Sequence, residues 1–259
     1  MRVAVTDEGE VSREIASSGN WEVVVIDSPN KVYQVKPDVI VHTFEIPYYE
    51  AGTRRDKAWT YNAWMAINIA KSGHKIGALN VYLSSFMIFN GRRGFYEETS
   101  TPEPLNYYGI TKLAGEIGIS ALGNYLVLRT GAIFSLSYRG FLFNHIRSLL
   151  LKGRAVCNRE FYLSLVSTRS LGRVISSLLS KGATGVINVG GRISQCEALG
   201  EIAKYSQGHV IEREGPKMDF SLDDWLLRTF GIKTSPKNEI RETFVREFHD
   251  NERKDTVVT

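Results

Sequence analysis

The stretch EPLNYYGITKLAGE, residues 103–116, places Tyr108 and Lys112 in the pattern Tyr-x-x-x-Lys. On a helix, residues four apart lie on one face, so the phenol and the ammonium are neighbours. A nearby positive charge lowers the pKa of a tyrosine, which is ordinarily near 10. Such a pair can transfer a proton to or from a carbonyl oxygen during hydride transfer. The pattern alone is weak, and the alternative is an ordinary exposed pair on a helix.

The sequence around this stretch alternates between apolar runs and helical patterns, which is typical of βαβ units and a parallel sheet. The strand-like runs are residues 3–5, 22–27, 37–42, 78–85 and 125–130, and helices are expected at 56–72 and about 107–122. Only about ten residues, SPNKVYQVKP, separate the second run from the third. A crossover helix needs a longer segment, so we expect this helix to be missing or reduced to a turn.

Motifs on both sides of the quoted stretch extend the pattern. Upstream lies YLSSFMIFNGRRGFYEETSTP, residues 82–102, and downstream lies YLVLRTGAIFS, residues 125–135. In this order the chain resembles the extended short-chain dehydrogenase/reductases, and within them the dTDP-4-dehydrorhamnose reductase family. The matching residues are Tyr96, Glu98, Pro102, Pro104, Asn106, Tyr108, Gly109, Lys112, Leu113, Gly115, Glu116, Arg129 and Thr130.

The resemblance extends from Met1 to about Phe230 and implies an α/β fold. The expected architecture is a Rossmann-like, doubly wound parallel sheet with a small C-terminal substrate lobe. The dinucleotide-binding core would be residues 1–135, completed by about 162–190, and the lobe residues 136–161 and 191–233. Residues 234–259 would form a charged helix and tail.

The resemblance also implies roles for individual residues. Tyr108 would be the proton donor, and Lys112 would lower its pKa and hold the nicotinamide ribose. Ser85 would hydrogen-bond the substrate carbonyl, or Ser84 if the register shifts by one residue. Asn62 would support a proton relay. The implied cofactor is NAD(P), and the implied substrate is a 4-keto nucleotide sugar.

The N-terminal stretch MRVAVTDEGEVSREI departs from the family at the phosphate-binding loop. Where three glycines are usual, the chain has Thr6, Gly9 and Ser12, so Gly9 is the remaining cofactor-binding glycine. The acids at positions 7, 8 and 10 would repel a diphosphate at a helix N-terminus that ordinarily attracts one. We expect these acids to cap the helix themselves.

Asp27 supports the prediction that the chain binds a dinucleotide cofactor. It ends the second strand about twenty residues past the loop, where an acid binds the adenosine ribose and favours NAD. The alternative is a plain turn residue before Ser28 and Pro29. The bulky Phe44 after the third strand, and Phe86 and Met87 after the fourth, replace family residues beside the cofactor and the sugar. The last two are expected in the core.

Two functions therefore remain open. One is a dTDP-4-dehydrorhamnose reductase-like enzyme acting on a nucleotide sugar with NAD(P)H. The other is a non-catalytic regulatory or scaffold homologue with weak or no dinucleotide binding, like the methionine adenosyltransferase regulatory β subunit, which this family includes. Such a homologue needs a protein partner, and a helical stripe of Ile240, Phe244 and Phe248 is a candidate surface, although such a stripe more often packs on its own domain.

Composition excludes several other classes. The net charge of +4 is scattered along the 259 residues, so a nucleic-acid partner is not expected. No apolar run approaches a membrane span, and the five histidines show no metal-ligand spacing. Cys157 and Cys196 are expected to be reduced thiols in a cytoplasmic protein. A homo-oligomer is possible.

Overall fold

The computed structural model describes the backbone of residues 1–255 and side chains up to Arg246. Its main sheet is parallel throughout, with the strand order β2-β1-β3-β4-β5-β9. The strands are β1 (Arg2–Val5), β2 (Glu22–Val25), β3 (Val39–His42), β4 (Leu79–Ser85), β5 (Tyr125–Thr130) and β9 (Gly185–Val189). The expected doubly wound α/β fold is confirmed.

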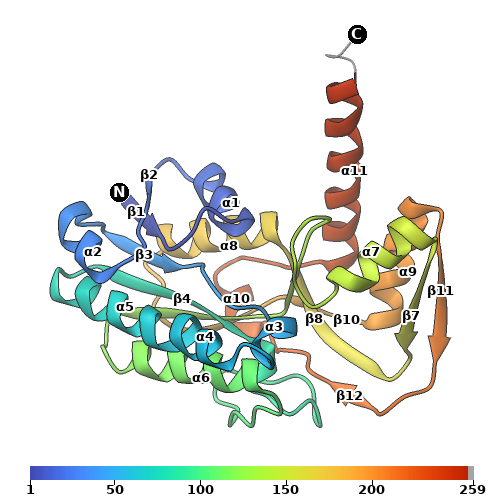
Figure 1. The fold of residues 1–259 in the computed structure, drawn as a ribbon, viewed down its shortest axis with the longest axis horizontal. Helices are drawn as coiled ribbons and strands as arrows, with labels where there is room; N and C mark the ends of the chain where they lie inside the picture. The colour runs from blue at the N-terminus through green and yellow to red at the C-terminus, as the bar shows by residue number, and fades with distance from the viewer. Residues whose placement is uncertain (256–259) are drawn as a thin grey trace.

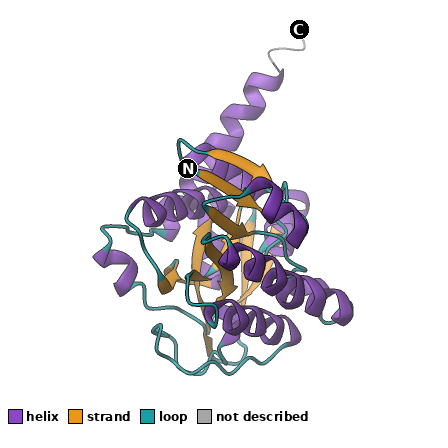
Figure 2. Cartoon of the chain, turned by 90° about the vertical axis from the view of Figure 1, so that its left-hand side faces the viewer, coloured by secondary structure: helices purple, strands orange, loops and turns teal. Residues whose placement is uncertain are grey.

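Helices cover both faces of this sheet (Figures 1 and 2). One face carries α1 (Glu10–Ser18), α8 (Thr168–Ser180) and α10 (Trp225–Thr229); the other carries α2 (Pro29–Val35), α5 (Ala66–Lys75) and α6 (Tyr107–Ser120). Alternate strand residues point to opposite faces, so Val3 and Val5 pack towards α1 while Ala4 packs towards α2. Burial on both faces explains why the strands are continuous apolar runs.

Two helical segments differ from expectation. Between β2 and β3 the chain forms α2, a helix of seven residues, where a missing helix or a single turn was expected. Pro29 lies at its first turn, where proline is favoured, and Lys36 ends it in the left-handed conformation. The expected helix at 56–72 consists of α4 (Arg55–Trp59), a π-helical turn at Thr60–Met65 and α5.

A smaller lobe contains two further sheets, flanked by helices. Its elements are β6 (Ala132–Phe134), α7 (Phe143–Lys152), β7 (Arg154–Asn158), β8 (Phe161–Ser167), β10 (Gly191–Ser194), α9 (Gln195–Ser206), β11 (His209–Arg213) and β12 (Met218–Asp219). β8 pairs with β6, β10 and β12, while β7 pairs with β11. Remaining short elements are α3 (Tyr48–Ala51) and a 3-10 turn at Phe86–Ile88.

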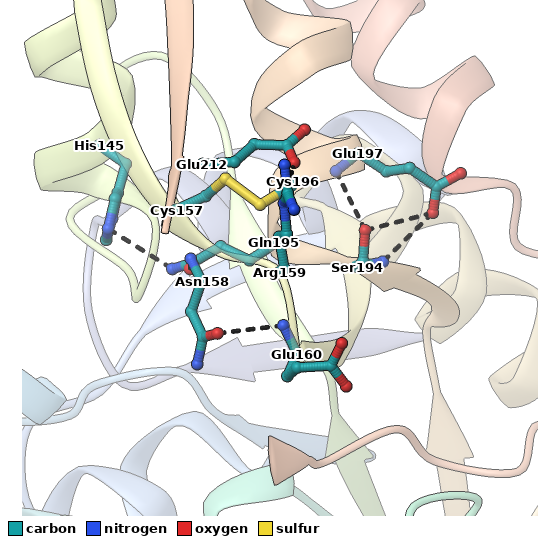
Figure 3. The surroundings of a disulfide bond; sticks show 10 residues. All are labelled: His145, Cys157, Asn158, Arg159, Glu160, Ser194, Gln195, Cys196, Glu197 and Glu212. Atoms are coloured by element: carbon teal, nitrogen blue, oxygen red, sulfur yellow. Dashed lines mark hydrogen bonds and ion pairs between the residues drawn. A yellow bond between two sulfur atoms is a disulfide. The ribbon is translucent and has the colours of Figure 1, made fainter. Parts of the chain in front are cut away.

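A disulfide joins Cys157 on β7 to Cys196 in the first turn of α9 (Figure 3). The Cα atoms are 5.3 Å apart, which is within the range that a disulfide spans. The prediction of reduced thiols is therefore wrong. Packing of α9 beside β7 brings together two residues 39 positions apart, and the cytoplasmic placement loses the support it drew from free thiols.

The last described helix is α11 (Pro236–Asp255), which extends away from the rest of the molecule (Figure 1). Ile240 and Phe244 are buried, and Phe244 stacks on Tyr205 of α9. These two residues of the expected stripe thus pack on their own chain; the side chain of Phe248 and the tail at 256–259 lie outside the described part. Within residues 1–255, no helix is both long and apolar enough to span a membrane.

Candidate active site at the Tyr108–Lys112 pair

Helix α6 carries the Tyr-x-x-x-Lys motif and begins at the carboxyl end of β4. The Asn106 side chain accepts a hydrogen bond from the Gly109 backbone N–H at 2.8 Å and so caps the helix. A methyl group at Gly109 would overlap the Met87 carbonyl oxygen. Glycine therefore lets α6 approach the chain after β4. This approach places Tyr108 at the carboxyl ends of the strands, where α/β proteins bind ligands.

The carboxylate of Glu45 lies between the two motif residues. Tyr108 Oη donates a hydrogen bond to Glu45 Oε2 at 2.9 Å, and Lys112 Nζ forms an ion pair with the same oxygen, also at 2.9 Å. Lys112 is nearly inaccessible, with 2% of its side chain exposed, whereas Glu45 keeps 21%. Lys112 also lies over the Tyr82 ring at 4.7 Å. The ammonium is thus neutralised within the protein.

This arrangement changes the proton affinities of the pair. Burial raises the pKa of Tyr108 well above its ordinary value, and the negative charge of Glu45 raises it further. Burial alone would lower the pKa of Lys112, but the charge of Glu45 and the Tyr82 phenol together raise it. A proton donor that works near neutral pH needs a pKa brought down towards the working pH. The phenol here is shifted in the opposite direction.

Asn62 holds the segment that carries Glu45. Its Oδ1 accepts from the Ile46 backbone N–H at 2.7 Å, and its Nδ2 donates to the Ile46 carbonyl and to Thr111 Oγ1, both at 3.0 Å. π-Helical turns such as 60–65 are frequent at functional sites. These bonds tie Asn62 to the backbone beside Glu45, and its proposed part in a proton relay stays a prediction.

Ser85 is the serine that shares a cavity with Tyr108. Its Oγ accepts a hydrogen bond from the Met87 N–H at 3.2 Å, whereas Ser84 Oγ donates to Glu116 in the core at 2.6 Å. The cavity is small, about 40 Å³, and aromatic side chains including Phe86, Tyr138 and Phe141 contribute to its lining. Phe86 and Met87 are buried in the core, as expected.

Two of the three phosphate-loop acids, Asp7 and Glu10, line a second cavity of about 160 Å³, together with Gly9, Thr43, Glu45 and Arg139 among others. We call it the acidic cavity. Asp7 Oδ1 accepts hydrogen bonds from Ser12 Oγ at 2.6 Å and from Thr43 Oγ1 at 2.7 Å. The expectation that the acids cap the helix is wrong, because α1 starts after Gly9 with no side-chain cap. Hydroxyl groups bind two of the acids instead, because Ser137 and Thr168 donate to Glu10 as Ser12 and Thr43 donate to Asp7.

Asp27 lines a third cavity, of about 220 Å³, together with Thr6, His42, Phe44, Tyr61 and Ala66 among others. We call it the Asp27 cavity. Asp27 itself is exposed and forms an ion pair with Lys31 at 2.9 Å. Asp27 therefore lies beside an apolar slot at the expected place for a nucleoside, and Gly9 lies in the neighbouring acidic cavity.

Sequence reasoning did not identify Glu45. One sequence signal was present: Glu45 follows the end of β3 by three residues, so it lies at the carboxyl ends of the strands with the predicted catalytic residues. Residues at these strand ends are candidates for the site in open α/β sheets. Among the described residues, no cluster of histidine, cysteine and acidic side chains could hold a metal ion.

Comparisons with known proteins give the chain its family. It is 39% identical over 93 residues to methionine adenosyltransferase 2 subunit beta of Bos taurus, covering 33% of this chain and 26% of that protein. Over 136 residues it is 31% identical to the dTDP-4-dehydrorhamnose reductase of Escherichia coli K12, covering 50% and 45%. The chain thus spans between a quarter and a half of the length of these relatives.

A solved structure matches nearly the whole chain. The dTDP-4-dehydrorhamnose reductase of Bacillus anthracis in complex with NADP has a TM-score of 0.85 at 22% identity, covering 95% of this chain and 99% of that one. At this identity the likeness establishes the fold. The family model for the RmlD substrate binding domain matches residues 18–215, and the chain belongs to that family.

Proposed function

We propose that this protein is a non-reducing member of the family that acts as a binding subunit of a protein assembly. The observation that carries the proposal is the Glu45 carboxylate bound to both Tyr108 Oη and Lys112 Nζ. In the reductase interpretation Lys112 holds the nicotinamide ribose and lowers the pKa of Tyr108. Glu45 accepts the single O–H of Tyr108 and one N–H of Lys112, and it neutralises the charge of Lys112.

The acidic cavity supports the same conclusion. A dinucleotide would bring a diphosphate towards Asp7 and Glu10, neither of which has a salt bridge to a cation within the described residues. Two like charges 4 Å apart repel by ~4 kcal/mol at an effective dielectric constant near 20. Arg139 is a cation on the lining of this cavity, and it stands against three carboxylates. NADP in the Bacillus anthracis relative is therefore a weak guide to this chain.

An exposed apolar surface supports a protein partner. Trp59 and Trp64, from the segment that packs against α6, are about half exposed, as is Ile110 of α6. Ile117, about two helical turns further along α6, is 61% exposed. Large exposed apolar side chains on neighbouring helices are typical of interaction surfaces. The subunit beta relative is named as part of a larger enzyme, which suggests the kind of partner to test.

The first experiment measures cofactor oxidation. The protein is mixed with NADH or NADPH and dTDP-4-dehydrorhamnose, with a dTDP-4-dehydrorhamnose reductase as positive control. We expect no oxidation above the rate without protein. Turnover that the Tyr108→Phe variant abolishes would overturn the proposal.

The second experiment measures molar mass by light scattering, for the protein alone and mixed with the methionine adenosyltransferase catalytic subunit of the same organism. We expect a complex, with itself or with that subunit, that Trp64→Glu and Ile117→Glu both weaken. Leu151→Glu is the matched control, because Leu151 is 70% exposed on α7 of the other lobe. A monomer in both samples would remove the support for an assembly role.

A reductase remains the second candidate because Ser85 and Tyr108 line one cavity. For this function Glu45 must leave the pair when cofactor binds. The oxidation assay separates the two candidates directly.

A further inference from the structure

A further cavity, of about 420 Å³, lies where α1, α8 and α11 meet the segment that follows β6. Every described residue that lines it is a glutamate, an arginine, a serine or a threonine. We call it the polar cavity. Its volume is within the range of roughly 300–1,000 Å³ that is usual for small-molecule sites, and its lining suits a small charged ligand.

Glu10 is a carboxylate held in a fixed position on this lining. Its Oε1 accepts a hydrogen bond from Thr168 Oγ1 and its Oε2 accepts one from Ser137 Oγ, both at 2.7 Å. Thr168 is buried at the start of α8, so two other elements orient the side chain from α1. A carboxylate has about four lone-pair sites, so Glu10 can accept further hydrogen bonds. It forms no ion pair with a cation of the described residues.

Arg169 and Arg13 are two guanidinium groups of this lining without carboxylate partners. Arg169, in the first turn of α8, is partly buried and has no hydrogen bond or ion pair within the described part of the chain. Arg13 on α1 donates to the Glu8 backbone carbonyl at 2.8 Å. The two helices are in close contact, because a methyl group at Gly172 of α8 would overlap the Glu14 carbonyl of α1.

The other charged groups of the lining have partners within the protein. Glu14 pairs with Arg246 at 3.6 Å, and Glu242 pairs with Arg173 at 3.5 Å. The groups left for a ligand are therefore two guanidinium groups and one carboxylate. The complementary ligand carries two negative charges and one positive charge. An amino acid with an acidic side chain has this set, in its α-carboxylate, its side-chain carboxylate and its α-ammonium group.

We propose that the polar cavity binds an acidic amino acid, with its carboxylates at Arg169 and Arg13 and its ammonium group at Glu10. Binding is non-covalent, and the site is separate from the Tyr108–Lys112 pair. The base of α11 forms one wall of the cavity, and the rest of this helix extends away from the molecule (Figure 1). A bound amino acid would therefore contact α11 as well as α1 and α8.

The test is a matched ligand series measured by calorimetry on the full chain at low salt. L-Glutamate carries all three charges, L-glutamine lacks the side-chain charge, and glutarate lacks the ammonium group. We expect glutamate to bind at least tenfold more tightly than either, because each of the others lacks one charged group that hydrogen-bonds to the lining. Glutamine or glutarate binding as tightly as glutamate would overturn the proposal, as would no binding of glutamate at millimolar concentration.

Variants locate the site on the chain. Arg169→Gln should weaken glutamate and glutarate at least tenfold, because both ligands carry two carboxylates. Glu10→Gln should weaken glutamate and glutamine, which carry the ammonium group, without weakening glutarate. Arg159→Gln is the matched control, because the Arg159 side chain is 60% exposed on the smaller lobe, and it should change none of the affinities. A preference for glutamate over glutarate that survives Glu10→Gln would overturn the placement of the ammonium group.

This proposal and the proposed function can fail separately. Oxidation of NADPH with dTDP-4-dehydrorhamnose would refute the non-reducing function, whatever the amino acids do. Failure of glutamate to bind, with no oxidation of NADPH, would refute only the site in the polar cavity.

Discussion

Replacing Glu45 with glutamine tests the interaction on which the proposed function rests. Glutamine keeps the size of the side chain and an acceptor for Tyr108 Oη, but it removes the charge that pairs with Lys112 Nζ at 2.9 Å. Lys112, only 2% exposed, would then be a buried cation that has lost its carboxylate partner and faces the rings of Tyr82 at 4.7 Å and Tyr108 at 6.0 Å. Removing one partner of a buried ion pair lowers the free energy of unfolding by about 3–5 kcal/mol, because the other charge is left buried without its partner. Because Glu45 keeps some exposure, we expect about 3 kcal/mol.

The assay is urea unfolding of four proteins in a double-mutant cycle: wild type, Glu45→Gln, Lys112→Met and the double variant. The double variant replaces the pair without leaving an unpaired charge, so it should be about 2–3 kcal/mol more stable than the sum of the single losses implies. Thermal unfolding of Glu45→Gln should shift down by roughly 10 °C.

The control for this cycle is Glu22→Gln, which breaks the exposed pair with Arg2 and should cost less than about 1 kcal/mol. A Glu45→Gln protein as stable as wild type, with no coupling in the cycle, would mean that Glu45 turns to solvent and that Tyr108 and Lys112 are free. The proposed function would then lose its supporting observation.

Three further predictions concern stability. His42 has a pKa of about 4 in the folded protein and 6.5 ordinarily, so its contribution to folding stability is complete above pH 6.5 and is lost as the pH falls through 4. At ~1.4 kcal/mol per pKa unit this loss is about 3 kcal/mol. The variant His42→Gln should therefore flatten the acid side of the curve of stability against pH, whereas the exposed control His74→Gln should leave it unchanged. Reducing the Cys157–Cys196 disulfide, which closes a loop of 39 residues, should lower the free energy of unfolding by about 4 kcal/mol. The reductant should have no such effect on a variant with alanine at both positions. Detection of two free thiols in the unreduced, denatured protein would contradict the pairing. Gly109→Ala should lower the unfolding midpoint measured by circular dichroism, because the added methyl group would overlap the Met87 carbonyl, and an unchanged midpoint would show that α6 can shift away at little cost.

The fold could be predicted from the sequence because its signals are local or belong to a specific motif. Continuous apolar runs identified the parallel strands, and the spacing around Tyr108 identified α6. Gly115 of the same motif has a clear structural reason: a methyl group there would overlap Tyr82 Oη and the Asn62 carbonyl, where α6 packs against β4 and the π-helical turn. Pro29 was interpreted as part of a turn, although Ser-Pro is also a helix start, and α2 begins there.

The site could be predicted only in part, because its decisive contacts join distant parts of the chain. Glu45 is 63 residues from Tyr108 and 67 from Lys112, and it lies in an irregular segment with no periodic pattern. The cysteines are 39 residues apart, and sequence alone gives no evidence that β7 and α9 bring them together. Asp7 was expected to bond helix N–H groups; the hydroxyl of Thr43, from another strand end, binds it instead.

The buried charge of Lys112 explains why a Tyr-x-x-x-Lys motif can persist without hydride transfer. An ammonium that is 2% exposed requires an opposite charge or strong hydrogen bonds, and in this protein Glu45 supplies the charge from within the chain. The same carboxylate accepts a hydrogen bond from Tyr108 Oη, while Asn62 fixes the neighbouring backbone by hydrogen bonds with the N–H and the carbonyl of Ile46. Loss of Lys112 would therefore leave the Glu45 carboxylate without its ion-pair partner, and loss of Tyr108 would remove one of the two groups that donate to it, whether or not a cofactor binds. Retention of the motif is thus evidence for the packing of α6 against the segment after β3, and a catalytic role requires the separate demonstration that Glu45 can leave.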